Sequence, residues 1–353
     1  MQFPFLFLRV FLRTGMKESR ERNPTRSRET TSSALTPGEM LDHYRIDSVV
    51  ARGGMSELYR ATDTRAGRKV ALKVPLPEMQ EDPVLFERFK REEEIGQLLD
   101  HPGIVKTFRG EEQRSRVYMV LEWVDGRLLR AILNEERKLP IERSVAIALR
   151  ICEALDVMHK HGVVHRDLKP ENIMVDSEDR IKLIDFGIAM KEDARRLTFV
   201  NLSATLGTPD YIAPEQVKGQ RGDQRSDIYT TGIMLYEMLT GQVPFAGPSP
   251  LAAMNERLLH DPPAPRDLNP EISPELQEII YRSLEREPRH RYATASEMAW
   301  DLEHQEQVGV EERGTQLSGA AGRKKANRVW LLYAALALIP VAIFIVMVLL
   351  AQK

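Results

Sequence analysis

The sequence is poor in cysteine, because Cys152 is the single cysteine among 353 residues. One thiol allows no internal disulfide, which suits a reducing compartment. Cys152 falls on an apolar helical stripe, so we interpret it as a buried core residue rather than a catalytic thiol. The eight histidines form no metal-ligand cluster with it, which argues against a structural zinc site.

A surplus of either charge is also missing, with 50 basic and 52 acidic side chains. A nucleic-acid binder would normally be basic, so we expect no nucleic-acid partner.

Long hydrophobic runs are absent except for one near the C-terminus. Residues 329–351 contain no charged side chain, and as a helix they would extend about 35 Å, enough to cross a bilayer. Arg323, Lys324, Lys325 and Arg328 precede this run and should stay on the cytoplasmic side. The sequence therefore predicts a single-pass tail anchor in the cell membrane, with the lipid bilayer as a partner and the preceding chain in the cytoplasm.

The N-terminal region shows a different pattern. Residues 1–15 are apolar but contain Arg9 and Arg13, and the stretch is too short to span a bilayer. No positive charge precedes it, as a secretory signal would require, and we interpret Met16 as the start of translation. Residues 16–40 are rich in Arg, Glu, Ser and Thr, which is typical of disordered chain.

These patterns divide the chain into four regions. We expect a disordered arm over residues 1–43, a folded body over 44–303, a basic-ended polar linker over 304–328 and a transmembrane helix over 329–351. The first third of the body contains strand-like runs such as 70–74 and 117–123, and the remainder is mainly helical in pattern.

The strongest motif is His-Arg-Asp-Leu-Lys-Pro-Glu-Asn at residues 165–172, followed by Asp-Phe-Gly at 185–187. Phosphoryl transfer needs a positioned hydroxyl, a base, and cations that offset phosphate charge. Asp167 fits the base, and Lys169 can neutralise the transferred group. Asn172 and Asp185 supply oxygen donors of the kind that Mg²⁺ prefers. Both motifs at this interval, with a strand-like run between them, form a very specific signal.

On these motifs the chain resembles the Hanks-type (eukaryotic-like) serine/threonine protein kinases of the bacterial, membrane-associated kind. The resemblance covers roughly residues 44–303. It implies an α+β, two-lobed protein kinase fold, with a small β-rich N-lobe over about 44–123 and a larger helical C-lobe over about 124–303. ATP would bind in the cleft between the lobes, together with Mg²⁺, for which Mn²⁺ can substitute.

Lys73 and Glu92 match the lysine and the glutamate that form an ion pair in the N-lobe of the family. Lys73 lies on a strand-like run and is the expected contact to the α- and β-phosphates. Glu92 lies on a stripe of apolar residues that recur at helical spacing, which places it on the inward face of a helix. Glu93 and Glu94 fall off that stripe, and we expect them to be solvated.

The loop expected to cover the phosphates departs from the family pattern Gly-x-Gly-x-x-Gly. It reads Ala-Arg-Gly-Gly-Met-Ser over residues 51–56. Gly53 and Gly54 keep the freedom to adopt positive φ and to approach phosphates closely. Ala51 and Ser56 lose that freedom, and we expect Ala51 to weaken ATP binding.

The run Leu-Glu-Trp-Val at residues 121–124 matches the family's hinge. The resemblance implies that backbone groups of Glu122 and Val124 bind adenine, that Leu121 is the gatekeeper, and that Asp125 contacts the ribose.

Further family motifs imply structural roles. Glu215, in Ala-Pro-Glu, should pair with Arg291, and Asp227 should brace the catalytic loop. Arg166 corresponds to the arginine that holds a phosphorylated residue of the activation segment in the family. Thr198, Ser203 and Thr205 are the available acceptors, and the sequence does not choose among them.

Lys169 and the Gly-Thr-Pro sequence at 207–209 favour serine/threonine over tyrosine specificity. We therefore predict ATP-dependent phosphorylation of Ser/Thr hydroxyls on proteins in signalling, with autophosphorylation of the activation segment. The alternative is a membrane-anchored pseudokinase scaffold, but such proteins usually lack one of the catalytic groups that this chain retains. A small-molecule kinase is a third, weaker interpretation, because the activation segment suits peptide substrates. The sequence leaves the oligomeric state open.

Overall fold

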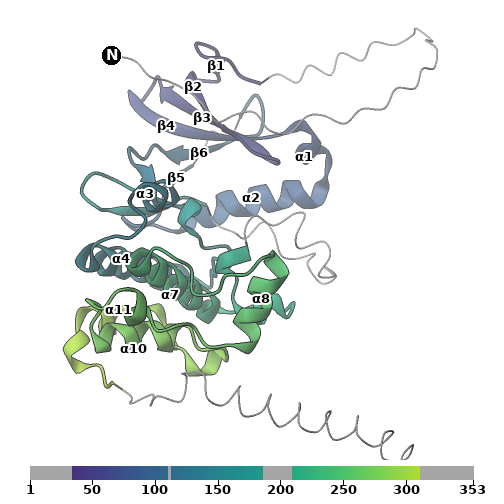
Figure 1. Cartoon of the computed structure of the whole chain (residues 1–353). Helices are drawn as coiled ribbons and strands as arrows, with labels where there is room; N and C mark the ends of the chain where they lie inside the picture. Colours follow the sequence, from purple (N-terminus) through teal and green to yellow (C-terminus); the bar gives the residue numbers. More distant parts are fainter. Residues whose placement is uncertain (1–33, 110–112, 186–208, 311–353) are drawn as a thin grey trace, which may run out of the picture. The chain divides into compact units, whose positions relative to one another are not determined.

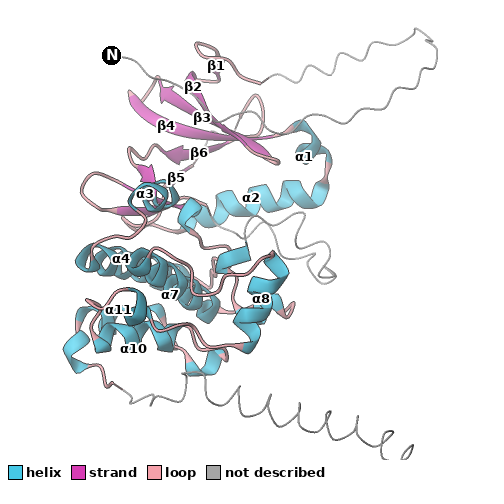
Figure 2. Cartoon of the chain, viewed as in Figure 1, coloured by secondary structure: helices cyan, strands magenta, loops and turns pink. Residues whose placement is uncertain are grey.

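The computed structural model describes residues 34–109, 113–185 and 209–310. The described chain from Thr36 onward contains a β-rich lobe followed by a helical lobe (Figures 1 and 2). This is the α+β, two-lobed arrangement that the motifs implied.

The N-lobe is built on a six-stranded antiparallel sheet with the order β1-β2-β3-β4-β6-β5. Its strands are β1 (Met40–Leu41), β2 (Tyr44–Arg52), β3 (Ser56–Asp63), β4 (Arg68–Pro75), β5 (Thr107–Phe108) and β6 (Met119–Glu122). Both expected strand runs are confirmed as β4 and β6. In their register Lys73 pairs with Met119, and Ala71 pairs with Leu121.

The expectation of a disordered arm up to residue 43 is wrong at its end. Met40 and Leu41 form β1, which pairs with Arg45 and Tyr44 of β2. Leu41 is buried, so hydrophobic burial and backbone pairing outweigh the polar composition of the preceding chain. Residues 1–33 lie outside the described ranges, and the rest of the arm stays a prediction.

Two helices follow β4: α1 (Pro77–Glu81) and α2 (Pro83–Leu98), which runs below the sheet in Figure 1. The Asp82 side chain accepts hydrogen bonds from the first-turn amides of Val84 and Leu85 and so caps α2. The buried face of α2 carries Phe89 and Glu92. The predicted inward stripe is therefore confirmed.

The C-lobe is organised around α4 (Ile141–Lys160) and α7 (Gln224–Thr240), which pack against each other. The residues of α7 from 226 to 239 are all buried, as expected for a helix enclosed on every side. At Gly232 a Cβ atom would lie 2.1 Å from the Ser283 hydroxyl, so glycine permits the close approach of α10 (Pro274–Ser283). Cys152 is fully buried in α4, and burial raises the pKa of its thiol. Its prediction as a core residue is confirmed.

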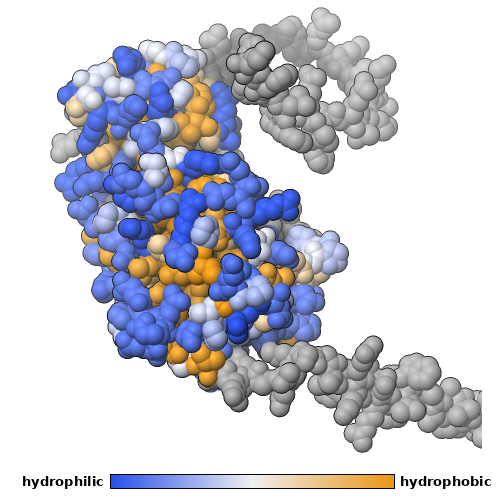
Figure 3. All heavy atoms as spheres, turned by 60° about the vertical axis from the view of Figure 1, so that its left-hand side comes forward, coloured by the Kyte–Doolittle hydropathy of each residue, from blue (hydrophilic) through white to orange (hydrophobic). Residues whose placement is uncertain are grey.

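Smaller elements surround this core. A three-stranded sheet has the order β7-β8-β9. The remaining elements are β7 (Arg127–Leu128), α3 (Leu129–Glu136), η1 (Pro170–Asn172), β8 (Ile173–Val175), β9 (Ile181–Leu183), η4 (Pro209–Tyr211), α6 (Pro214–Val217), α8 (Pro250–Leu259), α9 (Pro265–Leu268), η5 (Pro288–His290), α11 (Ala295–Glu303) and η6 (Gln305–Gln307). On the face shown in Figure 3, hydrophilic residues cover most of the surface, and hydrophobic residues gather in the middle and at the lower end.

The folded body continues past the expected boundary at residue 303. The short helix η6 contacts α10 and α11, and Val308 packs against the core. Every helix within the described ranges is too short or too polar to cross a lipid bilayer. Residues 329–351, where the sequence predicts a transmembrane helix, lie outside those ranges.

Candidate active site

Three charged residues from different elements meet between the lobes. Lys73 comes from β4, Glu92 from the buried face of α2, and Asp185 lies two residues beyond the end of β9. The Lys73 Nζ atom lies 2.6 Å from Glu92 Oε1 and 3.4 Å from Asp185 Oδ1. The structure therefore joins the expected phosphate-binding lysine, its acidic partner and the expected metal ligand in one cluster.

One ammonium group in this cluster faces two carboxylates, and their pKa values respond differently. Burial raises the pKa of Glu92 to about 7; Lys73 opposes this rise, and the charge of Asp185 adds to it. Burial alone would raise the pKa of Asp185 as well, but the charge of Lys73 lowers it overall. Burial would lower the pKa of Lys73, but Glu92 and then Asp185 raise it. Lys73 therefore stays charged, and Asp185 keeps its negative charge.

Asp167 lies in the segment 165–172, which is called the catalytic-type loop below. Lys169 Nζ lies 2.9 Å from Asp167 Oδ2, and the Asn172 side-chain amide donates to the Asp167 carbonyl oxygen at 2.8 Å. The Ile184 amide donates to the Asn172 carbonyl oxygen at 3.0 Å. This bond ties the end of β9 to the loop, and it brings Asp185 alongside Asn172.

The phosphate-covering loop is the tip of the β2–β3 hairpin. Ala51 pairs with Leu58, and the Gly53 amide donates to the Ser56 carbonyl oxygen at 2.9 Å. Neither Gly53 nor Gly54 has positive φ, so the freedom expected there is not used in this conformation. No heavy atom lies within 4 Å of a Cβ built on Gly54, which leaves its backbone accessible to a phosphate.

The hinge follows β6. Leu121 is buried, as expected for a residue that limits the depth of the cleft. The Glu122 carboxylate lies 2.7 Å from Lys182 Nζ. Its backbone amide donates to the Lys106 carbonyl oxygen at 2.8 Å, so this amide is already bonded within the N-lobe. Asp125 accepts a hydrogen bond from Trp123 Nε1 at 2.7 Å, and the structure gives no direct support for its expected ribose contact. Val124 is half-buried and packs against the core.

A cavity of about 470 Å³ lies against the hinge residues 122–125. Its other walls come from α4 and from the β8–β9 turn, and they include Arg150, Glu153 and Arg180. Neither Lys73 nor Asp185 lines it, so this cavity is separate from the charged cluster.

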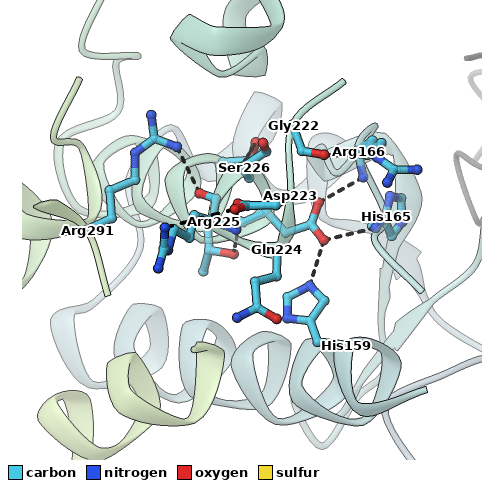
Figure 4. Close-up of polar contacts among 12 residues, drawn as sticks. His159, His165, Arg166, Gly222, Asp223, Gln224, Arg225, Ser226 and Arg291 are labelled. Atoms are coloured by element: carbon cyan, nitrogen blue, oxygen red, sulfur yellow. Dashed lines mark hydrogen bonds and ion pairs between the residues drawn. The ribbon is translucent and has the colours of Figure 1, made fainter. Parts of the chain in front are cut away.

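Asp227, near the start of α7, holds the catalytic-type loop from below. Its carboxylate accepts hydrogen bonds from the backbone amides of His165 at 2.9 Å and Arg166 at 2.8 Å, and from His159 Nε2 at 2.8 Å (Figure 4). Burial alone would raise the pKa of Asp227, but the bond from His159 and the charges of His159 and His165 lower it. Arg166 has a φ of 62°, and the two amide bonds to Asp227 hold this strained backbone in place.

A second buried ion pair supports the same region. Arg291 Nη2 lies 2.8 Å from Glu215 Oε2, and the Arg291 side chain is fully buried. Ser226 donates a further hydrogen bond to Glu215 at 2.6 Å. The structure thus brings together the two residues that the family motifs paired.

Sequence reasoning missed three contributors to this site. His159 lies on the same helical stripe as Cys152 and is a buried partner of Asp227, and a histidine on such a stripe could have indicated a buried hydrogen bond. Arg221 lies close enough to Arg166 that its charge, after burial, lowers the pKa of Arg166. Arg130 of α3 bonds Glu171 of the catalytic-type loop and Glu237 of α7, and no spacing in the sequence indicated this contact.

One expectation about α2 is wrong. Glu93 is not solvated, because its carboxylate lies 2.6 Å from Arg114 Nη2 and both side chains are largely buried. An ionic partner from another segment can place an acid inside the fold even where it lies off the apolar stripe.

The geometry can be compared with known proteins. The protein kinase domain family matches residues 44–301. The chain belongs to the protein kinase family. Curated relatives include a probable serine/threonine-protein kinase of Streptomyces coelicolor, 41% identical over 271 residues, which cover 76% of this chain and 40% of that protein. Another is the serine/threonine-protein kinase PknB of Mycolicibacterium smegmatis, 38% identical over 271 residues, covering 76% of this chain and 43% of that protein.

Solved structures of protein kinases also resemble this chain. The crystal structure of the Mycobacterium tuberculosis PknI kinase domain is 27% identical, with a TM-score of 0.59, and the match covers 77% of this chain and 100% of that domain. The chain spans less than half the length of the two curated kinases. The matched part is therefore the kinase domain, and the activity of this chain is argued from its own site.

The described residues also bear on metals. No group of three or more His, Cys, Asp or Glu side chains within the described ranges could hold a metal ion by itself. A kinase site does not need such a group of side chains, because the nucleotide phosphates supply further oxygen ligands to the metal.

The expected phosphorylation sites Thr198, Ser203 and Thr205 lie outside the described residues.

Proposed function

We propose that this kinase-family chain transfers the γ-phosphoryl group of ATP to serine and threonine hydroxyls of proteins. The observation that carries the proposal is the contact of Lys73 with Glu92 at 2.6 Å, with Asp185 at 3.4 Å from the same ammonium. Glu92 holds Lys73 at the cleft, where the ammonium can bind phosphate oxygens. The relatives are named serine/threonine-protein kinases, and this supports the choice of hydroxyl acceptor.

The donor atoms fit a divalent metal of the Mg²⁺ type. Asn172 uses its side-chain nitrogen on the Asp167 carbonyl, so its amide oxygen is left as an acceptor. The Asp185 carboxylate is about half exposed, and its lowered pKa keeps it ionised. Asn172 and Asp185 would hold the metal, which when bound offsets the charge of the phosphates.

Side chains of the protein activate the hydroxyl and align it with the phosphoryl group. Asp167 accepts the proton of the substrate hydroxyl and orients its oxygen toward the γ-phosphorus. Lys169, 2.9 Å from Asp167, can contact a γ-phosphate oxygen and so keep the hydroxyl and the phosphoryl group aligned. The Asp227 hydrogen bonds fix the loop backbone, so little reorganisation is needed at the moment of transfer.

The direct test uses the full chain, purified in detergent, with labelled ATP, Mg²⁺ and a generic protein substrate. We expect label on serine and threonine, and none with Asp167→Asn. Nucleotide binding without any transfer by the wild-type chain would contradict the proposal and favour the pseudokinase scaffold. Replacing Mg²⁺ by Mn²⁺ should retain activity, because both cations accept oxygen ligands.

We further propose that phosphorylation of the activation segment orders it through Arg166 and Arg221. These two cations lie close enough for one to lower the pKa of the other, and a phosphate adds up to two negative charges that can pair with arginine. Thr198, Ser203 and Thr205 are the candidate acceptors. Phosphopeptide mapping should find at least one of them modified in the active protein and none in Asp167→Asn. An active protein with an unmodified segment would contradict this regulation.

We also propose a single-pass membrane location with the kinase domain in the cytoplasm. Its support is the uncharged run 329–351 and the basic cluster just before it, together with the need of the reaction for cytosolic ATP. Deleting residues 329–353 should move the kinase from the membrane fraction to the soluble fraction with its activity retained. A truncated chain that stays with membranes, or digestion of the kinase domain by protease added outside intact cells, would contradict the proposal.

A further inference from the structure

Arg130 connects four elements at the front of the C-lobe. From α3, its Nε donates to Glu171 Oε1 at 3.1 Å, and its Nη1 donates to Glu237 Oε1 at 2.8 Å. Its Nη2 also bonds the Tyr211 hydroxyl. Glu171 belongs to η1, Glu237 to α7 and Tyr211 to η4. The guanidinium therefore sits where the catalytic-type loop meets the end of the activation segment.

The two carboxylates in this cluster differ in access. Glu237 is largely buried, whereas the Glu171 side chain is 43% exposed. Without Arg130 they would present two negative charges, one of them open to solvent, four residues along the loop from Asp167. Such a pair would attract a positive side chain strongly, because charge-assisted hydrogen bonds to carboxylates are among the stronger polar contacts in proteins.

A substrate must pass close to this cluster. Its hydroxyl has to reach Asp167, and an extended peptide advances about 3.3 Å per residue. Side chains within three residues of the acceptor therefore extend over roughly 10 Å on either side. Glu171 lies within reach of that path, because it belongs to the same short loop as Asp167 and Asn172, which are joined by a hydrogen bond. The Tyr211 hydroxyl shares the Arg130 guanidinium with Glu171 and therefore lies near it.

We propose that Arg130 determines the substrate specificity of this kinase: it is an internal counter-charge that occupies an acidic subsite beside the catalytic loop. A substrate with a lysine or arginine near its acceptor gains little there, because the carboxylates already have a cationic partner. The enzyme then accepts peptides without basic residues, and removing Arg130 converts the subsite to one that selects them. The inference rests on the proposed serine/threonine kinase activity.

The experiment compares otherwise identical threonine peptides. The parent has alanine around the acceptor, and each derivative carries one arginine at one position within three residues of it. We would measure kcat/KM for every peptide, relative to the parent, with full-length wild-type protein and with Arg130→Met. The wild type should vary by less than about threefold across the set. The variant should favour arginine at one or more positions by roughly tenfold, the effect of one charge-assisted hydrogen bond.

Arg143→Met is the matched control. Arg143 has a similarly exposed side chain and also joins two acids, Glu136 and Asp179, so the change in charge and in ion pairing is the same. It should leave the wild-type pattern of ratios unchanged. Adding Glu171→Gln to Arg130→Met should abolish most of the gained preference, whereas Arg130→Lys should keep the wild-type pattern because the positive charge remains.

Arg130→Met leaves Glu237 buried without its main cationic partner, and this can unfold the protein. The double variant Arg130→Met/Glu237→Gln removes that charge and should show a smaller arginine preference, through Glu171 alone. Uniformly reduced activity with unchanged ratios, in the single or the double variant, would show that Arg130 is only structural. A wild type that already prefers arginine tenfold would also overturn the inference. Failure of the wild type to label any peptide or protein would instead contradict the kinase activity itself.

Discussion

Two ionic centres near the catalytic loop are built in opposite ways. Around Lys73, one ammonium faces Glu92 and Asp185, and the Asp185 side chain is about half exposed. Around Asp227, one fully buried carboxylate receives three hydrogen bonds. The first centre has charge left to bind a ligand, whereas the second has its polar atoms directed at the protein itself.

The difference separates binding from support. A carboxylate that accepts three hydrogen bonds in a low-dielectric interior is held rigidly, and it stabilises the loop only while every donor stays in place. A lysine shared by two acids can exchange one partner for a phosphate at little cost. We therefore expect substitutions in the first centre to change chemistry and substitutions around the second to change stability.

The largest effect should come from Asp185→Asn. Loss of the negative charge removes the proposed metal ligand and leaves the core packing unchanged, so phosphoryl transfer should fall by at least about a thousandfold. The melting temperature should change by no more than a few degrees. Steady-state kinetics and thermal unfolding measure the two quantities. Asp261→Asn, which breaks only the surface pair with Arg286, is the control and should change neither. Near-normal activity of Asp185→Asn would remove the distinction between the two centres.

Arg291→Met should instead affect folding. Arg291 is fully buried, and it bonds Glu215 as well as the carbonyl oxygens of Glu285 and Arg225. Its loss leaves a buried carboxylate unpaired, which should lower the free energy of unfolding by about 3 kcal/mol. Urea denaturation measures this loss. Arg143→Met removes a more exposed arginine with two acidic partners, and it should cost less than about 1 kcal/mol. Equal losses in the two variants would contradict the assigned role of burial.

A smaller effect should appear in the pH dependence of stability. Burial alone would raise the pKa of Glu215, but its bonds with Arg291 lower it below the unfolded value of 4.5. Its contribution is therefore fully present above about pH 4.5 and is lost as the pH falls through the lowered folded pKa. Glu215→Gln should be less stable at pH 6 and should show a shallower decline below pH 4.5. Denaturation midpoints from pH 6 to pH 3 test this, with exposed Glu271→Gln as the control. Parallel curves for Glu215→Gln and the wild type would refute the linkage.

The smallest effect concerns the phosphate-covering loop. Ala51 lies in β2, paired with Leu58, where the family pattern has glycine. Ala51→Gly should lower KM for ATP by about two- to threefold, because the backbone gains freedom to approach the phosphates. Ala66→Gly, in the β3–β4 turn, should leave KM unchanged. An unaltered KM in Ala51→Gly would show that the first centre already positions the phosphates without help from this loop.

Much of the site could be predicted because its chemistry is local in sequence. Asp167, Lys169 and Asn172 lie within six residues, so their spacing alone indicates their proximity. Glu92 could be predicted for a different reason: helical periodicity placed it on the buried face of α2. The fold class followed from the same motifs, through the family they resemble.

Other features depend on partners far apart in the sequence. The Glu93–Arg114 pair and the Arg130–Glu237 pair join residues 21 and 107 positions apart, and periodicity carries no information about such contacts. The positive φ of Arg166 could not be predicted for a related reason, because the carboxylate that accepts the hydrogen bond of its amide belongs to Asp227, 61 positions away. The ends of the folded body shifted by a few residues, since β1 is stabilised by pairing with β2 and η6 by contacts with α10 and α11.

The short strand β1 has a practical consequence. Residues 38–41 cover the outer edge of β2, through the Met40–Arg45 and Leu41–Tyr44 pairs and the bonds of Gly38 and Glu39 with Ile46. A truncated protein that began at Tyr44, where the family match starts, would lose this cover and present an open sheet edge close to the exposed Val49 and Val50. Open apolar edges recruit strands from other molecules. Shortening the chain by these few residues would therefore promote aggregation, and recombinant kinase domains should begin before Thr36.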